Sequence, residues 1–252
     1  TPMNSSAASD VYKRQVPNTA SLKVGKGDTG KLQYVQIAGQ AFVKGSSDGH
    51  VVDPNDVDQG DLGDCSLMSG MAAIAKANPA AIHKLIKNLG KGKFAVTLYV
   101  DSGGLFNYKK THVETVTNFF PGTGKSPEYA QTSGDTKNNV EEIWPMLLEK
   151  ALAQYLGGYD KIESRGAGDM MEYLTGKEST YVKVASYGET ILAFVIKQAL
   201  KNNQAITAGT KDSISADLKK KDVVEDHSYA PLKVNTGNTL NLYNPHGHTH
   251  LN

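Results

Sequence analysis

A run of turn-forming residues gives way to a helix-forming run in the first third of the chain. Residues 58–64, Asp-Gln-Gly-Asp-Leu-Gly-Asp, contain two glycines, and residues 65–76, Cys-Ser-Leu-Met-Ser-Gly-Met-Ala-Ala-Ile-Ala-Lys, are mostly small or apolar. The change predicts a helix that begins at Cys65. We therefore expect Cys65 to lie where a loop becomes a helix.

Apolar residues at helical spacing predict further helices. These cover residues 78–89, 141–155, 169–176 and 190–201. Asn78-Pro79 favours a helix start, and Asp169 is a candidate cap. The pattern over 141–155 is the clearest, because its apolar positions follow one face and Pro145 falls in the first turn, where proline is tolerated.

Alternation of apolar and polar residues, together with apolar runs between turn signals, predicts strands. These cover residues 31–38, 40–44, 94–100, 105–117, 180–184, 205–210, 227–234 and 239–244. Residues 102–104 and 236–238 are turn signals, so the strands on either side of each are expected to form hairpins. Residues 119–139, rich in Gly, Pro, Ser, Thr and Asn, indicate a surface connection.

The last predicted hairpin brings two polar residues together. His227 begins its first strand and Asn244 ends its second, so both lie at the open end. Within the register that the turn allows, their side chains are expected to meet. Pro231, in the first strand, suits an edge or bulged position.

The position of Cys65 favours nucleophilic chemistry. At a helix start, unpaired backbone N–H groups and the positive end of the helix dipole favour the thiolate, the reactive form of cysteine. Gln59, six residues earlier, can direct its amide at charge that develops beside the sulfur. A base and a group that holds it, His227 and Asn244, complete the set that cysteine-dependent amide hydrolysis needs.

Three stretches resemble the calpain-type proteases of the papain-like clan. The first is Gln59-Gly60-x-x-Gly63-Asp64-Cys65, which resembles the family's active-site cysteine signature. The second, Trp144-Pro145-Met146-Leu147-Leu148-Glu149-Lys150-Ala151 with Gly158-Tyr159, resembles its "W-x-x-L-L-E-K-A…G-x-Y" helix. The third comprises Asp226-His227-Ser228-Tyr229 and Asn244-Pro245-His246-Gly247, which resemble its "G-H-A-Y" and "N-P-W-G" elements.

The resemblance implies a cysteine endopeptidase with an α+β, papain-like two-lobed fold. Cys65, His227 and Asn244 would be the catalytic residues, and Gln59 would form the oxyanion hole. We expect residues 1–15 to be a non-native or disordered leader and 16–252 to be the protease domain. Its helical lobe would cover about 58–130 and its helix and β lobe about 140–252, with the active site between them.

Two positions depart from the family pattern. His246 stands where the family has tryptophan after Asn-Pro, and Ser66 stands where it usually has tryptophan after the cysteine. The first departure predicts that a hydrophobic shield over the histidine and asparagine is absent.

Composition narrows the function classes. The chain has 252 residues, a net charge of +1 and a single cysteine, so an intramolecular disulfide is excluded and bulk electrostatics do not favour nucleic-acid binding. No apolar run is long enough to insert into a membrane. We expect a monomer that acts on a protein or peptide substrate, in the cytoplasm by default, with secretion left open.

No metal or other cofactor is expected to be required. His246, His248 and His250 alternate and would share one face of a strand, but no cysteine or acidic pair completes a metal site there. Calcium, which calpain relatives bind, remains possible, although the sequence holds no dense run of acidic ligands.

Two alternatives stay open. One is acyl transfer to an amine by the same three residues, and the other is a catalytically silent binding module that keeps the fold.

Overall fold

The computed structural model describes residues 32–44, 50–103, 108–133, 140–247 and 250–251. The helices are α2 (Cys65–Ala77), α3 (Pro79–Leu85), α4 (Trp144–Leu156), α5 (Ala167–Thr175), α6 (Glu189–Lys201) and α7 (Ala216–Lys219). The first strands are β1 (Gln33–Gln36), β2 (Gly39–Gln40), β3 (Ile86–Gly90), β4 (Lys93–Asp101), β5 (Lys109–Thr117) and β6 (Phe119–Thr123). The others are β7 (Ser126–Pro127), β8 (Glu141–Glu142), β9 (Ala208–Gly209), β10 (Ser228–Val234), β11 (Leu240–Tyr243) and β12 (His250–Leu251).

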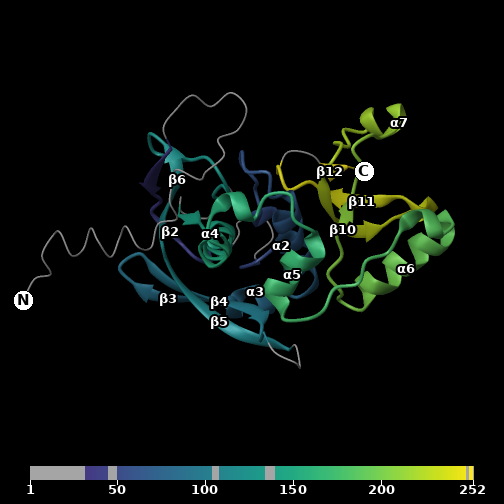
Figure 1. The fold of residues 1–252 in the computed structure, drawn as a ribbon. Coiled ribbons are helices and arrows are strands. Elements are labelled where there is room, and N and C mark those ends of the chain that lie inside the picture. Colours follow the sequence, from purple (N-terminus) through teal and green to yellow (C-terminus); the bar gives the residue numbers. More distant parts are fainter. Residues whose placement is uncertain (1–31, 45–49, 104–107, 134–139, 248–249, 252) are drawn as a thin grey trace, which may run out of the picture.

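The strands form small, mostly antiparallel sheets around the helices (Figure 1). One sheet has the order β3-β4-β5, a second β1-β6-β7, and a third β12-β11-β10-β9, while β2 and β8 form a parallel pair. The predicted α+β class is therefore confirmed. The sheet that contains β10 and β11 lies beside α6 at one end of the molecule, and β3, β4 and β5 lie at the other (Figure 1).

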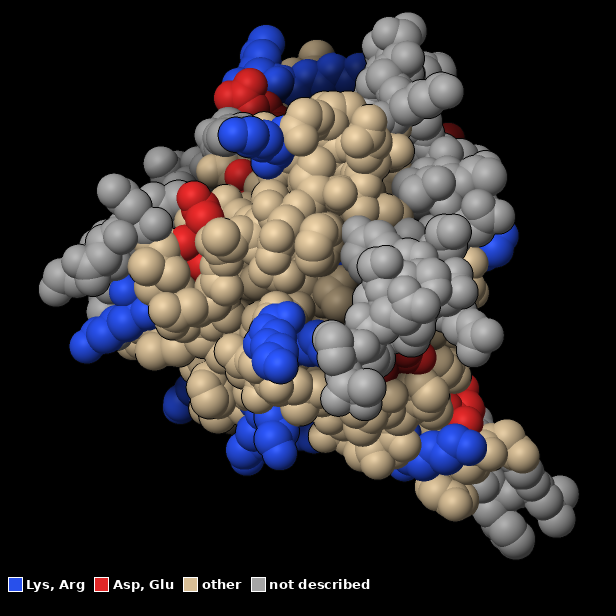
Figure 2. All heavy atoms as spheres, turned by 90° about the vertical axis from the view of Figure 1, so that its left-hand side faces the viewer, with Lys and Arg blue, Asp and Glu red and all other residues tan. Residues whose placement is uncertain are grey.

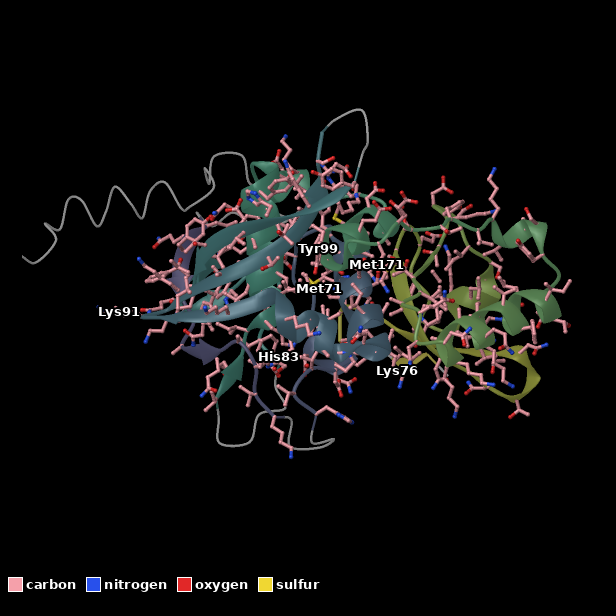
Figure 3. All side chains as sticks on the ribbon, turned by 90° about the horizontal axis from the view of Figure 1, so that it is seen from below. Met71, Lys76, His83, Lys91, Tyr99 and Met171 are labelled. Carbon is pink, nitrogen blue, oxygen red and sulfur yellow. The ribbon has the colours of Figure 1, made fainter. Side chains whose placement is uncertain are left out.

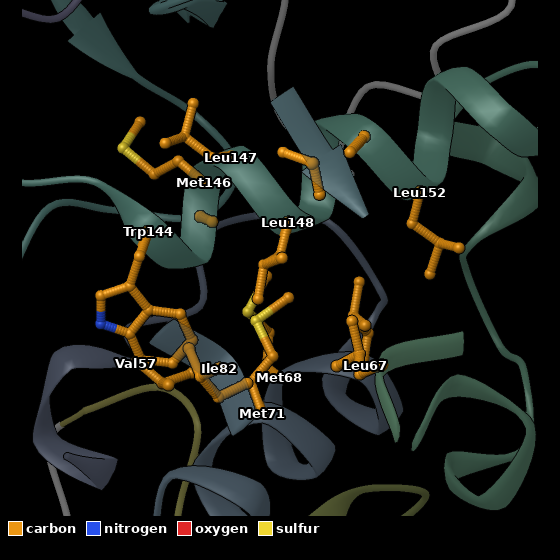
Figure 4. Packing of buried hydrophobic residues seen from close by; sticks show 14 of the residues in the cluster. Val57, Leu67, Met68, Met71, Ile82, Trp144, Met146, Leu147, Leu148 and Leu152 are labelled. Carbon is orange, nitrogen blue, oxygen red and sulfur yellow. The ribbon is translucent and has the colours of Figure 1, made fainter. Parts of the chain in front are cut away.

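The cysteine helix α2 forms the centre of the core. Every residue from Ser66 to Ala75 is buried. In Figure 4, Met68 and Met71 of α2 point toward Leu148 of α4, with Ile82 of α3 beside them. The family-like α4 segment therefore serves to pack the helix that carries Cys65.

Small residues let α5 approach α2 and the β4 strand closely. A Cβ added to Gly70 of α2 would lie 3.0 Å from the Met171 side chain of α5. Gly176, which ends α5 in the left-handed conformation at φ 68°, leaves room for the ring of Tyr99 on β4. Met171 and Tyr99 lie along this junction of helix and sheet (Figure 3).

Several predicted elements are confirmed. Helix α2 begins at Cys65, and α6 covers the predicted helix near 190–201. The pattern over 141–155 forms α4, with Pro145 in its first turn. The two predicted hairpins pair as β4 with β5 and β10 with β11, and the register of the latter shifts between Pro231 and Lys233, as a bulge at Pro231 predicts.

Other predictions were wrong at particular places. The helix predicted over 78–89 ends at Leu85, because Ile86–Gly90 pairs with β4 instead. No strand forms at 180–184, where Tyr181 is 86% exposed and the described residues offer no partner strand. Gly166, and not Asp169, caps α5. Local spacing predicts neither the pairing partner nor the exposure of such a segment.

Two other segments also differ from expectation. Residues 119–139 were expected to form a surface connection, but they include β6 and β7, and Phe120 and Tyr129 are buried. The strand predicted over 205–210 is limited to β9, which pairs with the start of β10. The expected leader at 1–15 lies outside the described residues.

Charged residues of both signs are scattered over the described surface. On the face in Figure 2, Lys and Arg side chains lie around an uncharged middle, with Asp and Glu interspersed and no continuous basic patch in the part that is coloured. Within the described ranges, no helix has the length and apolar character needed to cross a bilayer.

Candidate functional site

The open end of the β10–β11 hairpin holds His227 and Asn244 in contact. His227 Nε2 lies 2.9 Å from Asn244 Oδ1, and both side chains are buried. The predicted meeting of these two side chains is therefore observed. It follows from the antiparallel register, in which Ala230 faces Tyr243.

A second donor determines how this pair is oriented. The backbone N–H of His246 also faces Asn244 Oδ1, at 3.2 Å. A backbone N–H can only donate, so this atom of Asn244 must be the amide oxygen. His227 Nε2 must then carry its proton to donate to the same oxygen, and in the neutral ring Nδ1 keeps the lone pair.

Backbone contacts tie the hairpin to the loop that leads to the cysteine. Gln59 N–H donates to Pro245 O at 2.7 Å, and the Tyr243 hydroxyl donates to Val57 O. These bonds join residues that are more than 180 positions apart, since Tyr243 and Val57 are 186 residues apart in the sequence. The segment around 244–246 is thereby held against the cysteine loop.

Cys65 lies at the first position of α2, beside the start of β10. Its side chain is half-buried, and the backbone N–H groups of Ser228 and Ser66 act on the sulfur as hydrogen-bond donors. One turn along α2, Ser69 Oγ lies 2.7 Å from Ser228 Oγ. Since Ser228 directly follows His227, its contact with Ser69 ties the strand that begins beside His227 to the helix that carries Cys65. Cys65, Gln59, His227 and His246 line one cleft.

The protonation of Cys65 differs from what its helix position predicts. Burial raises the pKa of the thiol, the N–H groups of Ser228 and Ser66 oppose this effect, and the negative charge of Asp226 adds to it. Burial also lowers the pKa of His227, against the effect of its bond to Asn244. The neutral thiol and neutral imidazole are therefore the favoured resting forms, so the expectation of a resting thiolate is not met.

Gln59 lies in the cysteine loop with its amide close to the site. Its Nε2 donates one hydrogen to Leu62 O at 2.6 Å, and its Oε1 is buried with no hydrogen-bond partner among the residues that the structure describes. An NH₂ group has a second hydrogen to donate. Gly60, beside it, must lack a side chain, because a Cβ there would lie 2.2 Å from Glu128 O.

His246 covers His227 with an aromatic ring. The two imidazoles are stacked, with ring centroids 5.1 Å apart and an angle of 9° between the planes. His246 Nδ1 also lies 3.4 Å from Gln59 O. The histidine that replaces the expected tryptophan thus still provides a flat cover, although a polar one, and the prediction of an absent shield is corrected in this respect.

Comparison with known proteins agrees with the motifs. The family described as calpain family cysteine protease matches residues 42–252. The chain belongs to the calpain family. A curated relative, calpain-13 of Rattus norvegicus, is 23% identical over 208 residues, which cover 77% of this chain and 29% of that protein. The chain therefore spans less than a third of the length of this calpain relative.

Sequence reasoning did not assign a role to two acidic residues of this calpain-family site. Asp64 is fully buried, and neither of its carboxylate oxygens has a hydrogen-bond partner among the described residues. Burial raises its pKa well above the usual range, and Glu163 adds to the effect. Asp226 is exposed beside Cys65. The adjacency of each to a motif residue was the only available signal.

A pair of carboxyl groups lies away from the cysteine. Glu142, on β8, is 1% exposed, and its carboxyl group is in hydrogen-bond contact with that of Asp56. Asp56 Oδ2 also accepts hydrogen bonds from Asp53 N–H and Trp144 Nε1. Within the described ranges no three acidic, histidine or cysteine side chains are grouped as a metal site. The side chains of His248 and His250, considered above as metal ligands, are outside the description.

Proposed function

We propose that this calpain-family chain is a cysteine endopeptidase that hydrolyses peptide bonds with Cys65, His227 and Asn244. The observation that supports this most is the His227–Asn244 hydrogen bond at 2.9 Å, because it leaves the lone pair of the imidazole on Nδ1. A base in this tautomer can remove a proton from a thiol. Cys65 and His227 line the same cleft, and the backbone N–H of Ser228, the residue after His227, lowers the pKa of the Cys65 thiol.

The reaction proceeds in two stages. His227 takes the proton of Cys65 as the sulfur attacks the substrate carbonyl, and then gives it to the departing amine. This leaves a thioester between Cys65 and the acyl part of the substrate. Water, deprotonated by His227, attacks the thioester and releases the acid and the free thiol. Asn244 holds the imidazole in one tautomer throughout.

The free hydrogen of the Gln59 amide and the Cys65 backbone N–H stabilise the tetrahedral oxyanion. Removing one such donor typically reduces kcat by about a hundred- to a thousandfold. The substrate, a protein or peptide, lies in the cleft between the helical half that carries Cys65 and the β half that carries His227, in the manner of a two-lobed papain-like enzyme. The active form is a monomer.

The chemical step needs no metal, since thiol, imidazole and amide supply its groups. The described residues group no three acidic, histidine or cysteine side chains as a metal site, so we assign no calcium ligands.

Cleavage of a labelled casein and of a peptide library by the purified chain tests the proposed function. Cys65→Ala should abolish cleavage and change the free energy of unfolding by less than about 2 kcal/mol, since the change in volume is small. Asn244→Ala should reduce kcat while leaving some activity. Cleavage that survives Cys65→Ala would refute the proposal. Products joined to an added amine would indicate acyl transfer, and a folded chain without activity would indicate a binding module.

A further inference from the structure

Asp226 has an unusual backbone conformation next to the proposed catalytic histidine. Its φ is 46°, in the left-handed region that residues other than glycine, asparagine and aspartate seldom adopt. Its backbone N–H donates to Lys211 O at 2.9 Å, which holds the residue in place.

The carboxylate of Asp226 is free to meet another molecule. The side chain is exposed, and it forms no ion pair with any Lys, Arg or His in the described part of the chain. It lines the same cleft as Cys65 and His227. Its charge also opposes loss of the Cys65 thiol proton, as the smallest of several effects on the pKa of that thiol.

The charged side chains that act on the pKa of Cys65 are both acidic. Of the two carboxyl groups that act on Cys65, Asp64 is fully buried and its pKa is raised well above the usual range, which favours the neutral acid. His227 has a lowered pKa and is neutral near pH 7. The exposed charge that acts on the pKa of Cys65 is therefore the negative charge of Asp226, and a cationic group would complement it.

We propose that Asp226 is a specificity-determining residue that favours substrates with a Lys or Arg side chain next to the scissile bond. This inference rests on the proposed peptidase function. A bound cation would pair with the carboxylate in the cleft. It would also cancel the negative charge beside the sulfur, so the preferred substrate would assist formation of the nucleophile. The preference should then be visible in kcat as well as in KM.

The first experiment measures the electrostatic effect without any need for proteolysis. Cys65 is the only cysteine of the chain, so thiol reagents report on one site. The rates of modification by a trimethylammonium methanethiosulfonate and by a sulfonate methanethiosulfonate are compared. In Asp226→Asn the ratio of cationic to anionic rates should fall about tenfold, because loss of one charge changes the two rates in opposite directions. Asparagine tolerates the left-handed backbone, so the fold is retained.

Asp222→Asn is the matched control. Asp222 is also exposed and left-handed, with φ 56°, but it does not line the cleft. Its substitution should leave the ratio unchanged. An equal ratio in the wild-type chain and in Asp226→Asn would overturn the assigned electrostatic role.

The second experiment measures specificity with peptide pairs that differ only in Arg or Gln on either side of the cleaved bond. The wild-type chain should favour Arg by about tenfold in kcat/KM, and Asp226→Asn should remove the preference, while Asp226→Glu restores part of it. Cleavage without any preference for Arg would refute the role of Asp226 alone. An intact charge effect on thiol modification, with no cleavage of any peptide, would instead refute the proposed function.

Discussion

Glu142→Gln tests whether two carboxyl groups are held together at an energetic cost. Glu142 Oε1 accepts from Val43 N–H at 2.9 Å, and Oε2 accepts from the Ser133 hydroxyl at 3.3 Å. Burial, and then the charge of Asp56, raise the pKa of Glu142 from 4.5 to about 8. An acid with a raised pKa binds a proton in the folded state more strongly than in the unfolded state, so stability should fall as pH rises from 4.5 to about 8.

The size of this effect follows from the pKa difference. At about 1.4 kcal/mol per pKa unit, complete ionisation would cost at most about 5 kcal/mol. Water entry and side-chain movement recover part of that, so we expect about 2 kcal/mol at pH 8.5. Glutamine has the same shape, cannot ionise, and can donate from its NH₂ group to Asp56. Glu142→Gln should therefore be about 2 kcal/mol more stable than the wild-type chain at pH 8.5 and about equal to it at pH 5.

Urea unfolding between pH 5 and 8.5, with a calcium chelator present, measures the difference. Glu141→Gln is the control, because adjacent residues on β8 point to opposite faces. A wild-type chain whose stability stays flat over this range, or a Glu142→Gln variant with the same pH dependence, would contradict the reasoning.

Three further predictions concern the site and its loop. Gly60→Ala should lower the free energy of unfolding, measured by chemical denaturation, by more than about 3 kcal/mol, since its Cβ would overlap Glu128 O. In Gly63→Ala the added Cβ would lie 3.5 Å from its nearest neighbour, so this control should cost about 1 kcal/mol or less. Because burial lowers the pKa of His227, the acid limb of kcat/KM should lie below pH 6.5, and a limb above pH 7 in a pH–rate profile would contradict this. His246→Ala should reduce kcat for peptide cleavage about tenfold, because it removes the ring stacked on His227. His246→Trp keeps a ring at this position and should retain activity. Equal rates in the two variants would argue against a role of His246 in positioning His227.

The local elements of the site could be predicted from sequence because short-range spacing determines them. The helix start at Cys65 follows from the change of composition at that residue, and the β10–β11 hairpin follows from two alternating runs around one turn. The register of that hairpin then makes His227 and Asn244 neighbours. The same reasoning failed for Ile86–Gly90, where pairing with β4 outweighed helical spacing.

Burial and long-range contacts decided the properties that the chemistry depends on. The helix position of Cys65 predicts an easily formed thiolate, yet burial, with a smaller effect of the Asp226 charge, raises its pKa. The stack of His246 on His227 cannot be read from an Asn-Pro-His sequence, since it depends on how the hairpin meets the cysteine loop.

The sequence by itself therefore determined the family, the order of the candidate residues and the elements that carry them, because each depends on residues close together in the chain. Only the tertiary structure decided which nitrogen of His227 bears the proton, the direction in which the pKa of Cys65 moves, and the exposure of Asp226 in the cleft. The proton position, the pKa shift and the exposure depend on which groups from distant parts of the chain surround each side chain and exclude water from it. Local sequence patterns do not contain that information.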